Sequence, residues 1–307
     1  VAINADSGRR EWSRKTKLPL SAGPATDGKL VVAGSNDGDV IALEADTGEE
    51  RWRVRVTSEV LSAPAVADDR VFLRTVNGKL SALSAQDGSQ VWSIQQSMPR
   101  LSVRGASSPI VVRGRVISGF DNGKISAFDL DDGGVLWDVL LDPPSGRTEI
   151  ERLADINSDV QAAGGDVYAV GYQGRLGSIV LDSGQLLWSQ ELSSHSGLCV
   201  DNNNIYVTDQ QSEIVALSRA SGREIWRSKL IRNRDATAPA VYQGSIIVGD
   251  FEGYVHFFDP ATGDLQARVR AGGDRITSQP LVVNDMFYVM NDGGSLYAFR
   301  AELPQGE

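Results

Sequence analysis

The sequence is poor in the residues and segments on which several classes of protein depend. One cysteine, Cys199, stands among 307 residues, so the chain forms no internal disulfide and carries no four-cysteine zinc site. Its two histidines, His195 and His256, have no sequence neighbours that complete a metal or triad motif. His195 is expected in a surface turn and His256 at an outward strand position. The apolar runs are strand-sized, far below the ~20 residues of a membrane-spanning helix.

Positive charge is also scarce. The chain has 30 Lys+Arg against 40 Asp+Glu and a net charge of −10, and it contains no basic run. Nucleic-acid binders usually carry a basic face, because phosphate contacts supply most of their affinity. We therefore expect no nucleic acid among the partners.

What the sequence has is an internal repeat marked by tryptophan and glycine. Every tryptophan stands four residues after a glycine, at Trp12, Trp52, Trp92, Trp137, Trp188 and Trp226. A seventh copy keeps Gly263 but has Ala267 in the tryptophan position. Self-similarity with a period of about forty residues indicates a repeat architecture. We expect the indoles to pack between neighbouring repeats and to donate their N–H groups.

The interior of one repeat predicts short antiparallel strands. Runs of Val, Ile and Phe alternate with turn residues, as in residues 109–137. Asn77-Gly78 and Asn122-Gly123 suit type I′ hairpins, which need positive φ at both central positions. Four short strands per repeat, arranged around a ring, are typical of a β-propeller.

The number of repeats predicts the number of blades. The third-strand pattern occurs eight times, and the Gly-x-x-x-Trp pattern or its relic seven times. We predict an all-β fold, an eight-bladed β-propeller of four-stranded antiparallel blades, forming one domain over residues 1–307. The first blade would be incomplete, and an N-terminal piece outside this sequence would supply two of its strands and the outer strand of the last blade. A seven-bladed ring sealed by the strand at Trp12 is the alternative.

Two consecutive connections between blades are longer than the rest. They cover residues 93–108 and 138–159, which follow Trp92 and Trp137. Consecutive connections of this kind should be neighbours on one face of a propeller. Loops on a rigid scaffold often carry binding residues, and these two combine apolar residues with arginines and acids. The alternative is that the two loops pair with each other and only cap the pore.

The repeat resembles the tryptophan-docking repeat of quinoprotein dehydrogenase propellers, which bind pyrroloquinoline quinone with calcium. Many of those dehydrogenases have adjacent cysteines, whereas this chain has Cys199 alone. The stretches LSVRGASSP (101–109), TEIERLADIN (148–157) and VGDFEGYVH (248–256) instead resemble the BamB family, propeller lipoproteins of the bacterial β-barrel assembly machinery.

The BamB resemblance implies a non-enzymatic scaffold without a cofactor or metal. It implies a location at the periplasmic face of the outer membrane, held by an N-terminal lipid anchor that is absent from this sequence. The implied partner is BamA, through its periplasmic POTRA domains, and unfolded outer-membrane proteins are a further candidate. A quinone-dependent dehydrogenase and a general binder of β-strands at a blade edge are the alternatives.

The same resemblance assigns the partner-binding residues. The family contacts BamA through a Leu-x-Leu-Arg patch in one loop and an Asp-x-Asp patch in the next. Here the first patch comprises Leu101, Val103 and Arg104, and the second comprises Asp155 and Asn157. Val103 is a conservative departure, whereas Asn157 lacks a charge that the family pattern has.

Overall fold

The computed structural model describes residues 1–99, 101, 107–143, 148 and 155–301, and these ranges consist of β-strands joined by turns. They contain 29 strands and no helix. Accordingly, no described helix is long and apolar enough to cross a membrane. Backbone contacts divide the chain into two compact units, Val1–Val160 with Asp182–Gln185, and Gln161–Leu181 with Leu186–Glu307. The expectation of a single domain therefore stays a prediction.

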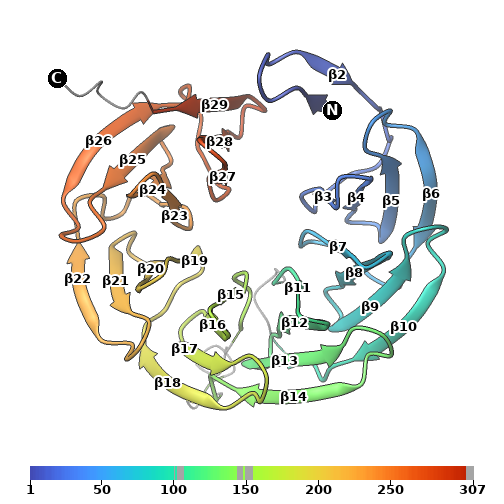
Figure 1. Cartoon of the computed structure of the whole chain (residues 1–307), viewed down its shortest axis with the longest axis horizontal. Helices are drawn as coiled ribbons and strands as arrows, with labels where there is room; N and C mark the ends of the chain where they lie inside the picture. Colours follow the sequence, from blue (N-terminus) through green and yellow to red (C-terminus); the bar gives the residue numbers. More distant parts are fainter. Residues whose placement is uncertain (100, 102–106, 144–147, 149–154, 302–307) are drawn as a thin grey trace. The chain divides into compact units, whose positions relative to one another are not determined.

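The first unit holds one two-stranded sheet, β1-β2, and three four-stranded sheets, each a meander in chain order (Figure 1). Its strands are β1 (Ala2–Ile3), β2 (Arg10–Trp12), β3 (Ala25–Thr26), β4 (Leu30–Gly34), β5 (Asp39–Glu44), β6 (Glu50–Arg55), β7 (Ala65–Ala67), β8 (Arg70–Arg74), β9 (Lys79–Ser84), β10 (Gln90–Gln95), β11 (Ile110–Val112), β12 (Arg115–Gly119), β13 (Lys124–Asp129) and β14 (Val135–Leu140).

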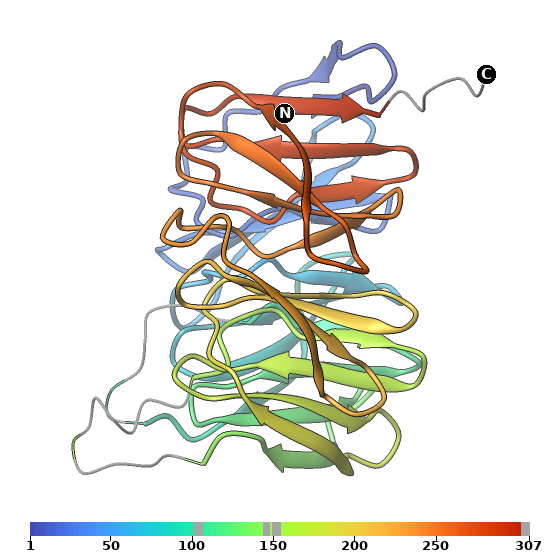
Figure 2. The same cartoon turned by 90° about the vertical axis from the view of Figure 1, so that its left-hand side faces the viewer.

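The second unit holds three four-stranded sheets and one three-stranded sheet, β27-β28-β29. Its strands are β15 (Gln161–Ala163), β16 (Asp166–Val170), β17 (Arg175–Val180), β18 (Leu186–Glu191), β19 (Gly197–Val200), β20 (Asn204–Thr208), β21 (Ile214–Ser218), β22 (Glu224–Ser228), β23 (Ala240–Tyr242), β24 (Ser245–Gly249), β25 (Tyr254–Phe258), β26 (Leu265–Arg270), β27 (Leu281–Val283), β28 (Met286–Met290) and β29 (Leu296–Arg300). Figure 2 shows these sheets following one another in chain order, each with the usual strand twist.

The sheets confirm the predicted all-β class and the eight blades. Among the described residues there are eight antiparallel sheets, and the first is the incomplete one that the repeat predicts. The competing count of seven is wrong, because β1 pairs with β2 as a sheet of its own, with Ala2 opposite Trp12.

Register places a small residue opposite each tryptophan. Ala127 of β13 faces Trp137 of β14, with a bulge directly after this pair. The same pairing recurs in the sheets with a full Gly-x-x-x-Trp motif. In the sheet β23–β26, which has Ala267 in the tryptophan position, the sizes are exchanged, because Phe257 of β25 faces Ala267 of β26. The two departures from the repeat at these positions therefore compensate each other.

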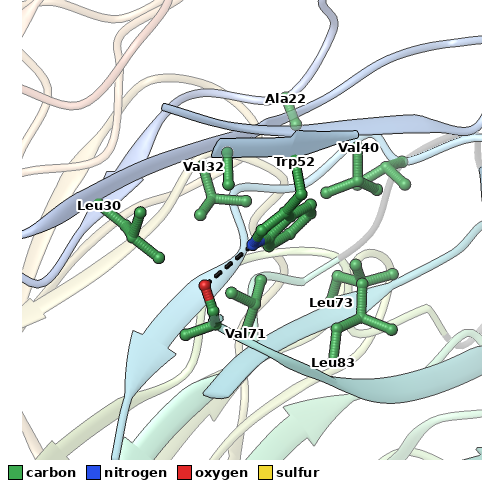
Figure 3. Packing of buried hydrophobic residues seen from close by; sticks show 11 residues of the cluster. Ala22, Leu30, Val32, Val40, Trp52, Val71, Leu73 and Leu83 are labelled. Atoms are coloured by element: carbon green, nitrogen blue, oxygen red, sulfur yellow. Dashed lines mark hydrogen bonds between the residues drawn. The ribbon is translucent and has the colours of Figure 1, made fainter. Parts of the chain in front are cut away.

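The indoles dock onto the next sheet, as the repeat predicts. Trp52 is buried, and its Nε1 donates to the carbonyl oxygen of Ala85 at 2.9 Å (Figure 3). An ideal Cβ on Gly88 would lie 2.8 Å from this indole, so the glycine makes room for the ring. Corresponding bonds from the indole Nε1 to a carbonyl of the next repeat occur at Trp12, Trp92, Trp188 and Trp226.

The predicted turn type at Asn122-Gly123 is wrong. Gly123 has a φ of 76°, but Asn122 is not in the left-handed region. The connection has four residues, and the N–H of Gly123 bonds to Phe120 O at 3.2 Å, so only the glycine needs positive φ. Two-residue turns with positive φ at both positions instead join the first strand of a sheet to its second. An example is Arg113 (48°) and Gly114 (72°), between β11 and β12.

Candidate functional site

A single hairpin turn supports both of the long connections. This turn, residues 120–123, joins β12 to β13 in the first unit. The Nδ2 of Asn122 donates to Ser97 in the first connection, to its carbonyl oxygen at 3.2 Å and to its Oγ at 3.3 Å. The carbonyl of Gly123 accepts the N–H groups of Leu141 and Asp142, at 3.0 and 3.2 Å, where the second connection begins. The start of each connection is thus tied to the same four residues.

The end of the second connection returns to this turn. The N–H of Ile156 donates to the carbonyl oxygen of Phe120 at 3.2 Å. The side chain of Ile156 is fully buried against Gly119, where an ideal Cβ would lie only 2.4 Å from Ile156 Cγ2. The same arrangement, a glycine at the end of a second strand beneath a bulky side chain, occurs at Gly34 with Val60. The middle residue of the predicted second patch is therefore an anchor in the core.

The two connections also meet directly at their ends. The N–H of Ser108 donates to Asp159 Oδ1 at 2.7 Å. Ser108 immediately precedes the proline that leads into β11, and Asp159 closes the second connection. The predicted proximity of the two connections is confirmed for these described residues.

The structure separates the predicted site residues by exposure. Leu101 is 44% exposed. Asp155 is 0% exposed, and Asn157 is half-buried. Val103 and Arg104 lie outside the described residues. The predicted patches therefore differ in kind, since the first reaches the surface at Leu101 and the second includes an interior carboxyl.

A buried ion pair that no sequence motif indicates lies beneath the supporting turn. Arg74 ends β8 with a fully buried side chain, and its Nη2 donates to Asp121 Oδ1. The guanidinium carbon also lies 5.0 Å from the centroid of the Phe120 ring, within cation–π range. Burial raises the pKa of Asp121, and the positive charge of Arg74 opposes that shift. Asp121 thus belongs to the predicted turn, but its side chain points into the protein.

A second buried charged group stands in the second unit. Asp250 is fully buried, and its Oδ2 accepts from His256 Nε2 at 2.7 Å and from Arg234 Nε at 2.6 Å. Burial acts to raise the pKa of Asp250, but hydrogen bonds from His256, from the Tyr254 N–H and from Arg234 outweigh it and hold the pKa at about 2. The expectation that His256 points outward is wrong, because this ion-pair network draws the ring inside.

The histidines and the cysteine do not assemble into a catalytic group within the described ranges. His195 is exposed, as expected, and lies 4.0 Å from Asp235, while His256 bonds to Asp250. Burial strongly raises the pKa of the Cys199 thiol, which keeps it in its unreactive protonated form. Across the described residues no three His, Cys, Asp or Glu side chains converge as a metal site would require.

A family model described as outer membrane protein assembly factor BamB matches residues 1–228 and 210–303 of the chain. A curated protein of that name from Pseudomonas aeruginosa is 36% identical over 156 residues, which is 51% of this chain and 41% of the relative. The matched part thus spans about two fifths of the length of the first curated relatives.

Solved structures agree with the family match. BamB from Moraxella catarrhalis superposes with a TM-score of 0.92 at 27% identity, covering 97% of this chain and 90% of that one. A quinohemoprotein alcohol dehydrogenase from Pseudomonas putida superposes with a TM-score of 0.60 at 12% identity, covering 89% and 70%. The dehydrogenase likeness concerns the fold alone.

Proposed function

Because the chain belongs to the family of outer membrane protein assembly factor BamB, we propose that it is a non-enzymatic scaffold of the bacterial β-barrel assembly machinery. It acts at the periplasmic face of the outer membrane, where an N-terminal lipid outside this sequence anchors it. As a single propeller domain it binds the periplasmic POTRA domains of BamA and assists the assembly of outer-membrane proteins.

The observation that carries the proposal is the joint support of the two long connections by residues 120–123. Loops held by a rigid scaffold present a surface at little entropic cost, which favours binding. Leu101 supplies an exposed apolar anchor at this place. Apolar anchors surrounded by polar groups are the usual composition of an interface centre.

The five predicted site residues take different parts in this proposal. Leu101 and Val103 contact apolar surface on BamA, and Arg104 pairs with a BamA carboxylate. Asn157 contributes a polar contact at the rim. Asp155, which is fully buried, orders the second connection instead of contacting the partner.

The test is a titration of immobilised BamA POTRA domains with purified variants. Leu101→Glu should weaken binding at least tenfold, because it places a charge in an apolar contact, and Arg104→Glu should do the same by repelling a carboxylate. Leu187→Glu is the matched control, since Leu187 has a similar exposure of 49% on the outer strand β18. Failure of the parent protein to bind contradicts the function. Unchanged binding by both variants would retain the function and move the site elsewhere.

Unfolded outer-membrane proteins are a second proposed partner, favoured by the exposed edge of β14. This strand is the outermost of its sheet, and Val135, Leu136 and Leu140 are each about half exposed on it. Charged side chains usually protect such edges, so an apolar edge suits the addition of an extended strand. Leu136→Lys should reduce capture of strand-forming peptides from outer-membrane proteins without affecting BamA binding. Equal capture by parent and variant would contradict this role for β14.

The quinone-dependent dehydrogenase alternative makes a separate prediction. A bound cofactor stabilises the state that binds it, so saturating pyrroloquinoline quinone with calcium would raise the melting temperature. We expect no shift, because no three His, Cys, Asp or Glu side chains converge among the described residues. A saturable rise in melting temperature would restore the alternative.

A further inference from the structure

The buried pair of Arg74 and Asp121 points to a role beyond packing. We propose that Arg74 is a positioning residue that fixes the turn at residues 120–123, so that the two long connections engage a partner as one unit. The proposal rests on the proposed function, because it concerns how that binding surface is held.

Arg74 ends its second strand at a position where three of the other described sheets have glycine and the rest have Val170, Thr208 or Met290. The last residue of the second strand is Gly34 in β4, Gly119 in β12 and Gly249 in β24. Each glycine leaves space for a bulky side chain of the following connection, namely Val60, Ile156 or Ile276. An ideal Cβ on the glycine would lie within 2.6 Å of that side chain. Each of these bulky residues stands five positions before the first residue of the next first strand, and Gly105 stands five positions before β11. Relative to those three junctions, large and small residues are therefore exchanged in the sequence at the junction after Arg74.

The pair buries polar atoms as well as two charges. Arg74 Nε, Arg74 Nη1 and Asp121 Oδ2 are buried and have no hydrogen-bond partner in the part of the chain that the structure describes. Unsatisfied buried polar atoms destabilise the folded state, and replacing a buried ion pair by apolar residues is often neutral or stabilising. Since apolar side chains often replace a buried ion pair without loss of stability, the place of this pair beneath the turn points to a functional role.

The structure links the pair to both connections through short paths. Asp121 is itself part of the turn, and Phe120 stacks under the guanidinium of Arg74. From the turn, the hydrogen bond of Asn122 to Ser97 reaches the first connection. The hydrogen bond of Ile156 to Phe120 reaches the second. A displacement of the turn would therefore move the start of the first connection and the end of the second together.

The variant that tests this is Arg74→Met combined with Asp121→Leu, which replaces the ion pair by apolar side chains of similar size. We expect an unchanged or higher melting temperature together with about tenfold weaker binding to BamA POTRA domains. Arg74→Lys, which keeps the charge but loses the planar fork, should bind with intermediate affinity. Arg70→Met is the control, because Arg70 starts the same strand and pairs with the exposed Asp131 at 2.7 Å.

A second measurement does not depend on the partner. The N–H groups of Ile156 and Leu141 bond to the turn, so their amide hydrogen exchange should be faster in the double variant than in the parent. The increase in exchange rate should be at least tenfold larger than the increase at Val60. The N–H of Val60 makes the corresponding bond, to Ser35 O at 3.1 Å, in a blade without this arginine. If the double variant does not fold, Arg74→Lys carries the same comparison.

The outcomes separate the two proposals. Faster exchange at Ile156 with weaker binding supports the positioning role. Parent-like exchange at Ile156, or exchange that rises equally at Val60, overturns it whatever the binding result. If the parent protein itself fails to bind BamA, the proposed function fails, while the exchange data still decide whether Arg74 positions the turn.

Discussion

Replacing Gly119 by alanine should disturb the candidate site through one identifiable clash. An ideal Cβ at this position would lie 2.4 Å from Ile156 Cγ2 and 2.8 Å from the Ile156 carbonyl oxygen. Overpacking of this kind costs about 1–3 kcal/mol. Rotation of the Ile156 side chain cannot relieve the contact with its backbone, so we expect a loss near the upper end, about 2–3 kcal/mol, and a displaced second connection.

Gly114→Ala is the control, because it should cause a similar loss of stability at a different place in the fold. A Cβ there meets no atom within 4 Å, but the φ of 72° strains any other residue. Gly114→Ala should therefore cost about 1–2 kcal/mol without touching either connection. Urea unfolding measures both losses, and titration with BamA POTRA domains measures their effect on binding. Only Gly119→Ala should weaken binding.

A double-mutant cycle tests the cause of the loss. In an Ile156→Ala background the Cγ2 atom is gone, so Gly119→Ala should destabilise by at least 1 kcal/mol less than it does in the parent. Full additivity of the two changes would refute the clash as the mechanism. Parent-like stability of Gly119→Ala alone would refute the packing argument for Ile156 altogether.

Three further predictions concern single side chains. The pKa of Asp250 lies at about 2, below the ordinary 3.8, so its stabilising effect is complete above pH 3.8 and is lost as the pH falls through 2. The stability advantage of the parent over Asp250→Asn, from urea unfolding, should shrink by about 2 kcal/mol between pH 5 and pH 2; a constant difference would contradict this. Trp52→Phe should cost about 1–3 kcal/mol in urea unfolding, because Ala85 O loses its indole donor; a cost below 0.5 kcal/mol would argue against the docking bond. Cys199 should react with a thiol reagent only after denaturant is added, and rapid native labelling would contradict its burial.

Blade number and strand positions could be predicted because each repeat carries its own local signals. Alternation and turn residues recur along the repeats and the Gly-x-x-x-Trp spacing in six of them, so a copy that has lost its tryptophan, at Ala267, is still recognised from the others. The turn at Asn122-Gly123 was assigned the wrong type, because dipeptide preference does not reveal that the loop has four residues. The local sequence contains a hairpin signal, but the neighbouring hydrogen bonds decide its geometry.

The site was harder to predict because burial is decided by neighbouring blades. Arg74, Asp121 and His256 stand among ordinary strand and turn residues, and nothing in their own segments shows that other blades enclose them. Asp155 was expected as a contact residue, yet it is fully buried next to Ile156, whose anchoring role depends on Gly119 some 37 positions earlier. Segment length correctly singled out both connections, since length needs no knowledge of tertiary packing.

Indoles that dock onto the next sheet, such as Trp52, make the blades dependent on one another in folding. Trp52 belongs to one sheet, but the carbonyl that satisfies its N–H belongs to the next, so neither sheet is complete alone. Stability of such a chain is a sum of nearest-neighbour terms, as in other repeat proteins. Excising a single blade would remove two such junctions and leave an unpaired donor on one side and an unpaired acceptor on the other. Fragments cut between blades should therefore fold less stably than their length suggests, whereas lengthening a connection within the intact chain should be tolerated.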